Sequence, residues 1–327
     1  MLRSLLLFLF LPTLTLDASD QRHDWDTDIL AETFGYHAAS PSDYPWSELI
    51  QACPHRDCIP AIDSPSFVAA KDASFLHEDD IVIAVSLAGE ARAYPIRILV
   101  RHELVNDNIG GTPLLVSYCP LCGSGLVFDR ELDGEAVEFG VSGLLHNSDL
   151  VMYDRKSASL WQQITGTAFA GAKRKQVLAA IPSSMTTWSQ WRSAHPNTRV
   201  LSMDNGLPPG SYEHWPYGDY ANSDRLMFPV SLRDARAHPK MVIYGADIDG
   251  HAVAYAQDYL REQRLLEDEI AGRALIVTYA DDGGVTVSEP KSGRSWLAHR
   301  LFWFAWYSFH PDTVLRSGDT SPDKAQP

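Results

Sequence analysis

The sequence is poor in basic residues and, beyond its N-terminus, in long apolar runs. Its 27 Lys and Arg residues face 42 Asp and Glu residues, which gives a net charge of −15. Nucleic acid and anionic membrane surfaces repel such a chain, so we expect neither as a partner. No window after residue 18 approaches the roughly 18 consecutive apolar residues of a transmembrane helix, so we expect no stable membrane insertion of the mature chain. A small molecule or another protein remains as the partner class.

The N-terminus has the composition of an export signal. Arg3 supplies a short positive region, residues 5–11 are apolar, and residues 16–18 end in the small Ala18. We predict that residues 1–18 are a signal peptide and that the mature protein is exported, either periplasmic or secreted. The alternative is a retained membrane anchor. Lipid attachment at this point is excluded because no cysteine lies near residue 18.

A shift of 161 positions aligns one stretch of the chain with another. Residues 89–118 and 250–279 match without a gap, and twelve of the thirty positions are identical. The identical residues are mainly apolar residues, glycine and tyrosine, as a shared backbone requires. The thiols of Cys119 and Cys122 and the imidazole of His102 have no counterpart in the second stretch. The chemistry is therefore predicted to lie in the first copy.

These patterns predict a β-rich α+β fold of two related copies of a strand-turn-strand-helix-strand unit, packed together, with the second copy degenerate. The expected parts are an irregular N-terminal arm (19–60), the first copy (61–202), a linker (203–240), the degenerate second copy (241–316) and a disordered tail (317–327). Each copy should end with a short helix that contains the spacing Trp-x-x-Trp, near residues 187–196 and 303–311.

Within the first copy, the apolar pattern predicts strands over residues 81–87, 90–94 and 113–117. Pro95 is expected to start a helix that continues to Leu104 and ends in a polar turn over residues 106–111. Residues 144–149 are expected to form a loop between two apolar strands.

Cys119-Pro120-Leu121-Cys122 is a pair that can close a disulfide, poise a thiolate for exchange or supply two metal ligands. A thioredoxin-like use would need a helix to follow, but Gly123-Ser124-Gly125 starts helices poorly. Cys53 and Cys58 are a second close pair and a disulfide candidate in an exported protein. A four-thiolate zinc site made from both pairs is an alternative that their spacing disfavours.

Two histidines are candidates to complete a site around Cys119, the expected nucleophile or central ligand. His102 lies at the end of the predicted helix, close to the strand that carries Cys119, so it could bind a metal or deprotonate the thiol. Glu103 beside it is a candidate supporting or acid/base group. The ordinary interpretation is a helix-end histidine followed by a solvated glutamate.

His146-Asn147-Ser148-Asp149 brings polar residues to the ends of two apolar strands, where functional sites are often built. His146 is therefore a candidate metal ligand, and Asp149 a supporting or acid/base group. The alternative is a segment that only caps the loop.

Four strings carry a resemblance to a known family. They are Arg101-His-Glu-Leu-Val-Asn-Asp107, Tyr118-Cys-Pro-Leu-Cys-Gly-Ser124, the segment from Phe139 to Asp154, and Leu160-Trp161. Together they resemble the bacterial and archaeal family called domain of unknown function 3179 (DUF3179), over residues 59–202 and more faintly 240–315. The family pattern has Trp at the position of Arg101. It does not include Cys53 and Cys58, which supports a local disulfide between these two residues. The resemblance implies no particular activity.

We therefore expect an exported protein with a metal or reactive-thiol site in the first copy. Its expected metal ligands are Cys119, Cys122, His102 and His146, and this donor set favours copper or zinc over magnesium or calcium. An enzyme would additionally need an open coordination position or an activated Cys119. Two alternatives stay open, namely a non-catalytic, disulfide-stapled binding module and a periplasmic thiol–disulfide redox protein.

Overall fold

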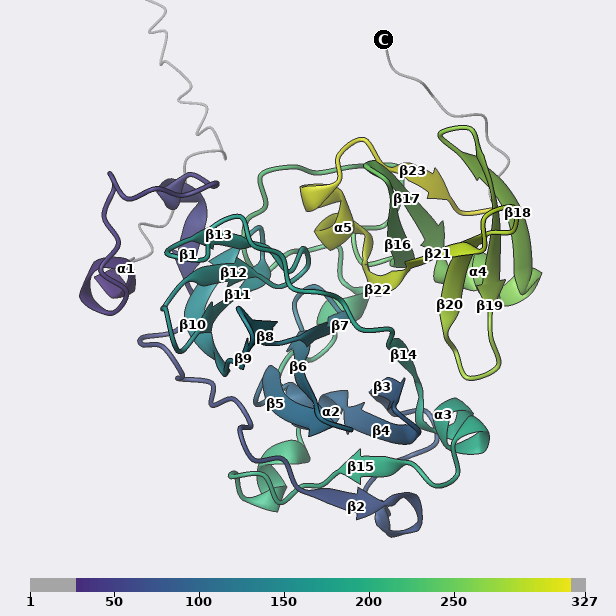
Figure 1. Cartoon of the computed structure of the whole chain (residues 1–327), viewed down its shortest axis with the longest axis horizontal. Coiled ribbons are helices and arrows are strands. Elements are labelled where there is room, and N and C mark those ends of the chain that lie inside the picture. Colours follow the sequence, from purple (N-terminus) through teal and green to yellow (C-terminus); the bar gives the residue numbers. More distant parts are fainter. Residues whose placement is uncertain (1–27, 319–327) are drawn as a thin grey trace, which may run out of the picture.

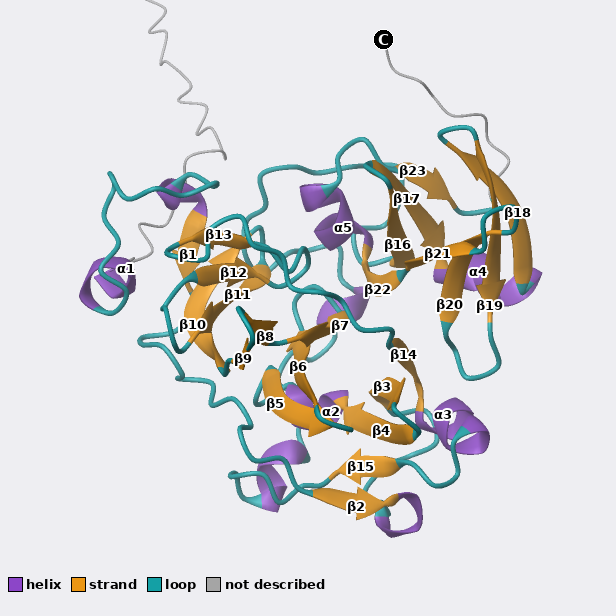
Figure 2. Ribbon diagram, viewed as in Figure 1, coloured by secondary structure: helices purple, strands orange, loops and turns teal. Residues whose placement is uncertain are grey.

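The computed structural model describes residues 28–318. The predicted signal peptide over residues 1–18 lies outside the described part, and so does the predicted tail from residue 319 onward. The described chain is rich in β-strands and has few, short helices (Figure 1, Figure 2), which confirms the expected β-rich class. No helix within residues 28–318 has the length and apolar character needed to cross a membrane.

One sheet is built around the antiparallel hairpin of β3 (Ile81–Leu87) and β4 (Glu90–Pro95). Around this hairpin, β14 (Ser184–Thr187) pairs antiparallel with β3, β15 (Arg199–Leu201) pairs parallel with β4, and β2 (Phe67–Ala69) lies at the far edge. The four residues 82–85 of β3 are at most 1% exposed. Burial on both faces explains why this strand is a continuous apolar run without polar alternation.

The next three strands form an antiparallel sheet that carries the cysteine pair. They are β5 (Leu104–Ile109), β6 (Thr112–Cys119) and β7 (Ser124–Asp129). The predicted helix up to Leu104 was too long, because α2 covers only Ile96–Leu99, and the predicted polar turn at 106–111 lies mostly inside β5. The apolar residues Val105 and Ile109 fit a strand as well as a helix end, and pairing with β6 buries both of them completely.

A five-stranded antiparallel sheet follows. It contains β1 (Leu49–Gln51), β10 (Phe139–His146), β11 (Asp149–Asp154), β12 (Leu160–Gln162) and β13 (Ala168–Ala170), with the small hairpin β8 (Glu131–Leu132) and β9 (Glu135–Ala136) before it. The predicted loop at 144–149 is a two-residue turn, because β10 runs to His146 and β11 begins at Asp149. Asn147 and Ser148 have φ of 52° and 62°, as a type I′ hairpin turn requires, and Asn tolerates this conformation well.

The C-terminal part contains two four-stranded sheets. The first has β22 (His299–Phe302), β16 (Val242–Ile248), β17 (His251–Ala256) and β23 (Val314–Arg316) in that order. The second is the antiparallel series β18 (Leu265–Ile270), β19 (Arg273–Tyr279), β20 (Val285–Glu289) and β21 (Arg294–Leu297). In the first of these sheets, β22 is antiparallel to β16 and β23 is parallel to β17. The N-terminal sheet has the same arrangement, because β14 is antiparallel to β3 and β15 is parallel to β4.

The remaining helices are short. They are α1 (Asp28–Glu32), α3 (Trp188–Ala194), α4 (Gln257–Gln263) and α5 (Trp303–Phe309), with single 3-10 turns at 46–48, 70–72, 209–212 and 220–222. Helices α3 and α5 are the two predicted Trp-x-x-Trp helices. Trp191 of α3 donates its indole N–H to Thr198 at 3.0 Å, and Trp306 of α5 donates to Thr313 at 2.9 Å.

A shared apolar core joins the two parts of the chain. It includes Leu126 and Trp161 from the N-terminal part together with Leu301, Phe302 and Trp303 from the C-terminal part. Burying one side chain of this size stabilises the fold by roughly 2–3 kcal/mol. Cys119 and Cys122 belong to the same core, so the cysteine turn lies where the two parts meet.

Candidate metal centre

The cysteine turn is held between β6, β7 and β22. Cys119 is the last residue of β6 and pairs in register with Ser124, the first residue of β7. Gly123 has a φ of 57°, and a Cβ atom there would lie 2.9 Å from the ring of Phe302, so only glycine fits. The Phe302 N–H donates to the carbonyl of Cys122 at 2.8 Å. The turn is thus fixed by backbone contacts on both sides.

The hairpin turn between β10 and β11 brings a carboxylate to the same place. The carbonyl oxygen of Ser148 lies 3.8 Å from the Cys119 sulfur and 3.4 Å from the Cys122 sulfur, and it accepts from both thiols. Asp149 follows directly as the first residue of β11. The positive φ at Ser148 turns its carbonyl toward the thiols and starts β11 beside them.

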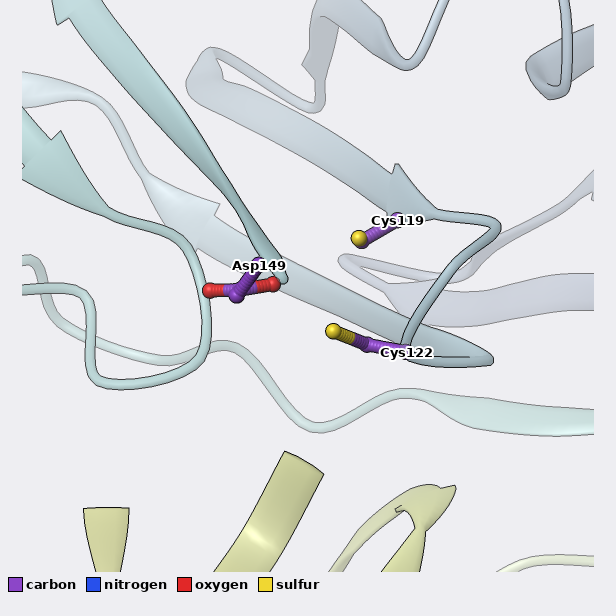
Figure 3. A group of neighbouring side chains, drawn as sticks. All are labelled: Cys119, Cys122 and Asp149. Atoms are coloured by element: carbon purple, nitrogen blue, oxygen red, sulfur yellow. The ribbon is translucent and has the colours of Figure 1, made fainter. Parts of the chain in front are cut away.

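The two sulfurs and one carboxylate oxygen of Asp149 all lie within 4.8 Å of one another. Figure 3 shows both sulfurs directed toward the carboxylate from the two sides of the cysteine turn. Cys119 is 1% exposed, and Cys122 and Asp149 are fully buried. Within residues 28–318, this is the one group of His, Cys, Asp or Glu side chains close enough to share an ion. Two sulfurs bound to tetrahedral zinc at about 2.3 Å would lie about 3.8 Å apart, so the spacing is compatible with ligation.

Burial dominates the acid–base properties of the group. It raises the pKa of both thiols, and that of Cys122 is raised well above its usual range because the neighbouring Cys119 adds to the effect. Burial also raises the pKa of Asp149 to about 6, although hydrogen bonds from Gln162 and the Ile164 N–H act in the opposite direction. A negative charge is therefore costly here unless a cation accompanies it.

Glu103 is a fourth acid that faces the group. Burial, together with the nearby charge of Asp149, raises its pKa to about 8. Its own charge in turn raises the pKa of Cys119. The backbone of Glu103 has a φ of 60°, which ends the α2 turn and directs the chain into β5. Neither Glu103 nor Asp149 forms an ion pair with any residue of the described chain.

Two polar atoms beside the thiols have unused hydrogen-bonding capacity. Asp149 Oδ2 accepts from Gln162 at 2.6 Å and from the Ile164 N–H at 3.0 Å. Asp149 Oδ1 and the hydroxyl of Tyr220 are buried and have no N–H or O–H partner within residues 28–318. Buried polar atoms are normally satisfied, so an unsatisfied carboxylate oxygen next to two thiols fits a site for a cation.

The predicted linker, residues 203–240, covers the two thiols and the carboxylate. Ser148 donates its hydroxyl to the carbonyl of Phe228 at 2.9 Å, and the Ser231 N–H donates to the Asn147 side chain at 2.7 Å. Burial raises the pKa of Tyr217 and of Tyr220, and charge on the thiols raises both further, so the two phenols also face the sulfurs. The sequence analysis missed these covering residues; the only signal was the Pro-, Gly- and Tyr-rich composition of the linker.

His102 forms its hydrogen bonds with residues outside the thiol–carboxylate group. Its Nδ1 lies 2.7 Å from the carbonyl of Pro60, and its Nε2 lies 2.7 Å from the hydroxyl of Tyr212. The short α2 explains this position, since His102 sits in the turn after the helix and points toward the arm and the linker. Both ring nitrogens are occupied, and His102 is not part of the ligand group.

His146 also lies outside the ligand group, although it is connected to it. Its Nδ1 lies 2.8 Å from Gln162 Oε1, and its Nε2 lies 3.1 Å from Glu48 Oε2. Of the six predicted site residues, the structure thus brings Cys119, Cys122 and Asp149 together, with Glu103 facing them and the two imidazoles bonded to other partners. Asp149, expected in a supporting role, is the third member of the group that could hold an ion, and no histidine belongs to it.

Cys53 and Cys58 form a disulfide, as the sequence predicted. The loop that it closes is tied to β10, because the Ala52 N–H donates to Gly143 at 2.9 Å and the Asp57 N–H donates to Val141 at 2.8 Å. Cys119 and Cys122 are both free thiols. The four-thiolate alternative does not apply to this arrangement.

The fold and the site define a β-rich protein with a buried pair of thiols beside a carboxylate. The model of the family described as protein of unknown function (DUF3179) matches residues 56–300, most of the chain. The chain belongs to this family, as the resemblance in its sequence indicated. Neither the curated proteins nor the solved structures gave a match.

Proposed function

We propose that Cys119, Cys122 and Asp149 bind a metal ion and that this ion is zinc. The observation that carries the proposal is the convergence of two thiols and a carboxylate oxygen within 4.8 Å in the protein interior. Burial is the largest influence on all three groups, and repulsion by the charge of Asp149 raises the pKa of both thiols further. A divalent cation would remove that repulsion and would use the free carboxylate oxygen.

The carboxylate decides between the two expected metals. Copper(I) prefers soft sulfur ligands, whereas zinc accepts thiolate and carboxylate ligands together. Asp149 is fully buried and has one unused oxygen, so it supports zinc. Three protein ligands leave a fourth coordination position for water or a substrate, and Glu103 is a buried acid beside the group that could act on a molecule bound there.

A freely reactive thiol is less well supported. Cys119 is 1% exposed and burial raises its pKa, whereas reactive cysteines are partly exposed with a lowered pKa. The same two features weigh against rapid thiol–disulfide exchange with a protein partner. The cysteine pair is therefore assigned to ligation.

We also infer that the protein works in an oxidising, exported compartment and that its two parts arose by duplication. The Cys53–Cys58 disulfide supports the compartment. The offset of 161 residues supports the duplication, because it superimposes the bounds of β3 on those of β16 and the bounds of β4 on those of β17. On this interpretation the second part kept the scaffold and lost the thiols.

Metal analysis tests the proposal. The protein, purified with its disulfide intact, is expected to carry about one equivalent of zinc by elemental analysis, or to take up one equivalent after dialysis against zinc. Cys119→Ser, Cys122→Ser and Asp149→Asn should each lose it. Counting free thiols in the unfolded protein should give two, which would show that Cys119 and Cys122 are reduced.

Asp154→Asn is the matched control, because Asp154 is a fully buried aspartate at the other end of β11 that bonds to Ser157 and Trp161. This variant should keep its zinc. Failure of the wild type to bind zinc, with Cys119 and Cys122 joined in a disulfide, would refute the proposal and favour the stapled binding module. Stoichiometric copper with no zinc would refute the choice of metal.

A further inference from the structure

Four side chains form a continuous hydrogen-bonded series from the thiols to the protein surface. Asp149 accepts from the Gln162 amide at 2.6 Å, the Gln162 carbonyl lies 2.8 Å from His146 Nδ1, and His146 Nε2 lies 3.1 Å from Glu48 Oε2. Gln162 is fully buried and His146 is 2% exposed, whereas the Glu48 side chain is 41% exposed. The series thus begins in the interior and ends in solvent.

The direction of each hydrogen bond follows from the two ends. A carboxylate only accepts, so the amide NH₂ of Gln162 must face Asp149 and the amide carbonyl must face His146. The carbonyl also only accepts, so His146 Nδ1 must carry a proton. His146 therefore donates from Nδ1 to Gln162, while its Nε2 faces the carboxylate of Glu48.

Aromatic rings hold the imidazole of His146 in place. The ring stacks on Tyr44 with centroids 4.1 Å apart and an interplanar angle of 27°. Phe309 of α5 approaches the ring edge-on, with centroids 5.7 Å apart. These contacts restrict the rotation of the imidazole, and within the described chain Glu48 is the acid whose carboxylate lies against its Nε2.

We propose that His146, held in place by Glu48 and Tyr44, is a positioning residue that orients Gln162 and thereby keeps Asp149 turned toward the two sulfurs. The inference rests on the proposed metal site. Asp149 Oδ2 is occupied by Gln162 and by the Ile164 N–H, which leaves Oδ1 for a metal. Hydrogen bonds of this kind fix a ligand's orientation, and their loss typically costs 10–100-fold in metal affinity.

Two substitutions at one position separate this role from simple packing. His146→Gln keeps an N–H that can donate to Gln162, whereas His146→Leu fills similar space without a donor. We expect His146→Leu to weaken zinc binding about 10–100-fold and His146→Gln to bind within about threefold of wild type. Affinity is measured by competition with a chromophoric chelator, and the visible spectrum of the cobalt-substituted protein reports whether the carboxylate still binds.

His102→Leu is the control, since His102 is as buried as His146 and bonds only to Pro60 and Tyr212. It should leave zinc affinity and the cobalt spectrum unchanged, even if it lowers stability. Equal losses in His146→Leu and His146→Gln, or no loss in either, would overturn the positioning role.

A metal-independent measurement keeps this test separate from the metal proposal. Nitrogen-15 NMR of the metal-free protein should show a proton on Nδ1 of His146, in a hydrogen bond to the Gln162 carbonyl. A bare Nδ1 in the wild type would overturn the inference even if zinc binds. Absence of zinc binding combined with a protonated Nδ1 would refute the metal site while leaving the hydrogen-bonded series intact.

Discussion

Glu103 and Arg264 have the same backbone conformation at equivalent points of the two parts of the chain. Their φ angles are 60° and 62°, and their carbonyl oxygens accept the N–H of Tyr118 and of Tyr279, each at 2.8 Å. The side chains differ completely. Glu103 is buried and faces the thiols, whereas Arg264 is exposed and pairs with Asp281. One backbone thus supports an acidic interior site in one part and an ordinary surface ion pair in the other.

Zinc binding should release protons. Because burial raises the pKa of both thiols, each is protonated at neutral pH and must lose its proton when it binds the metal. Calorimetric titration at pH 7, in buffers of different ionisation enthalpy, should give release of about two protons per zinc. Below about pH 6 the release should rise toward three, because Asp149 then carries a proton too. Binding without proton release would contradict thiolate ligation.

Part of this site could be predicted from the sequence. The Cys-x-x-Cys spacing, and the absence of cysteine at the positions 161 residues later, pointed to Cys119 and Cys122. The roles of His102 and Asp149 were not readable, because they depend on where α2 stops and on a hairpin turn at Asn147-Ser148. Neither the end of a four-residue helix nor a turn without glycine has a strong local pattern.

The fold was predictable to a similar degree. A β-branched run identified β3, an apolar run identified the strand that carries Cys119, and the Trp-x-x-Trp spacing identified α3 and α5. Strand β5 was missed because Leu104 also fits helical spacing and the polar residues from Asn106 onward are typical of a turn. The covering of the site by the linker depends on long-range contacts, such as that between Ser148 and Phe228, which no local pattern encodes.

The metal-free protein should become less stable as the pH rises toward 8. Burial raises the pKa of Glu103 to about 8, so the folded chain holds a proton that the unfolded chain releases near pH 4 to 5. The stability contributed by this group is full below that range and is lost progressively up to about pH 8, at roughly 1.4 kcal/mol per pH unit. The raised pKa of Asp149 also makes the free energy of unfolding fall as the pH rises, up to about pH 6.

Glu103→Gln should reduce this slope and make the metal-free protein more stable than wild type at pH 8. Urea unfolding between pH 5 and pH 9 measures the effect. Glu90→Gln, at a half-exposed side chain, serves as the control and should leave the slope nearly unchanged. Parallel stability curves for wild type and Glu103→Gln would show that Glu103 titrates normally.

Gly123 and Phe302 should be energetically coupled. A Cβ at residue 123 would require a left-handed backbone and would press on the Phe302 ring at 2.9 Å. Gly123→Ala should therefore destabilise the protein by about 1–3 kcal/mol and weaken zinc binding by moving the cysteine turn. In the Phe302→Leu background the cost should be smaller, as a double-mutant cycle of unfolding free energies would reveal. Strict additivity would rule out the contact.

The two Trp-x-x-Trp helices should depend on the same hydrogen bond. Thr198→Val and Thr313→Val each leave a buried indole N–H without its acceptor, so each should cost about 1–2 kcal/mol of stability. Thr112→Val at the start of β6, where the side chain is partly exposed, should change stability by less than about 0.5 kcal/mol. A large cost at only one of the two helices would argue that they are not equivalent.

X-ray absorption at the zinc edge of the metal-loaded protein tests the central claim most directly. Two sulfur scatterers at about 2.3 Å together with oxygen scatterers at about 2.0 Å are expected, and Cys122→Ser should show no bound zinc. A zinc ion surrounded only by nitrogen and oxygen would contradict the account, because it would mean that the buried thiols are not the ligands.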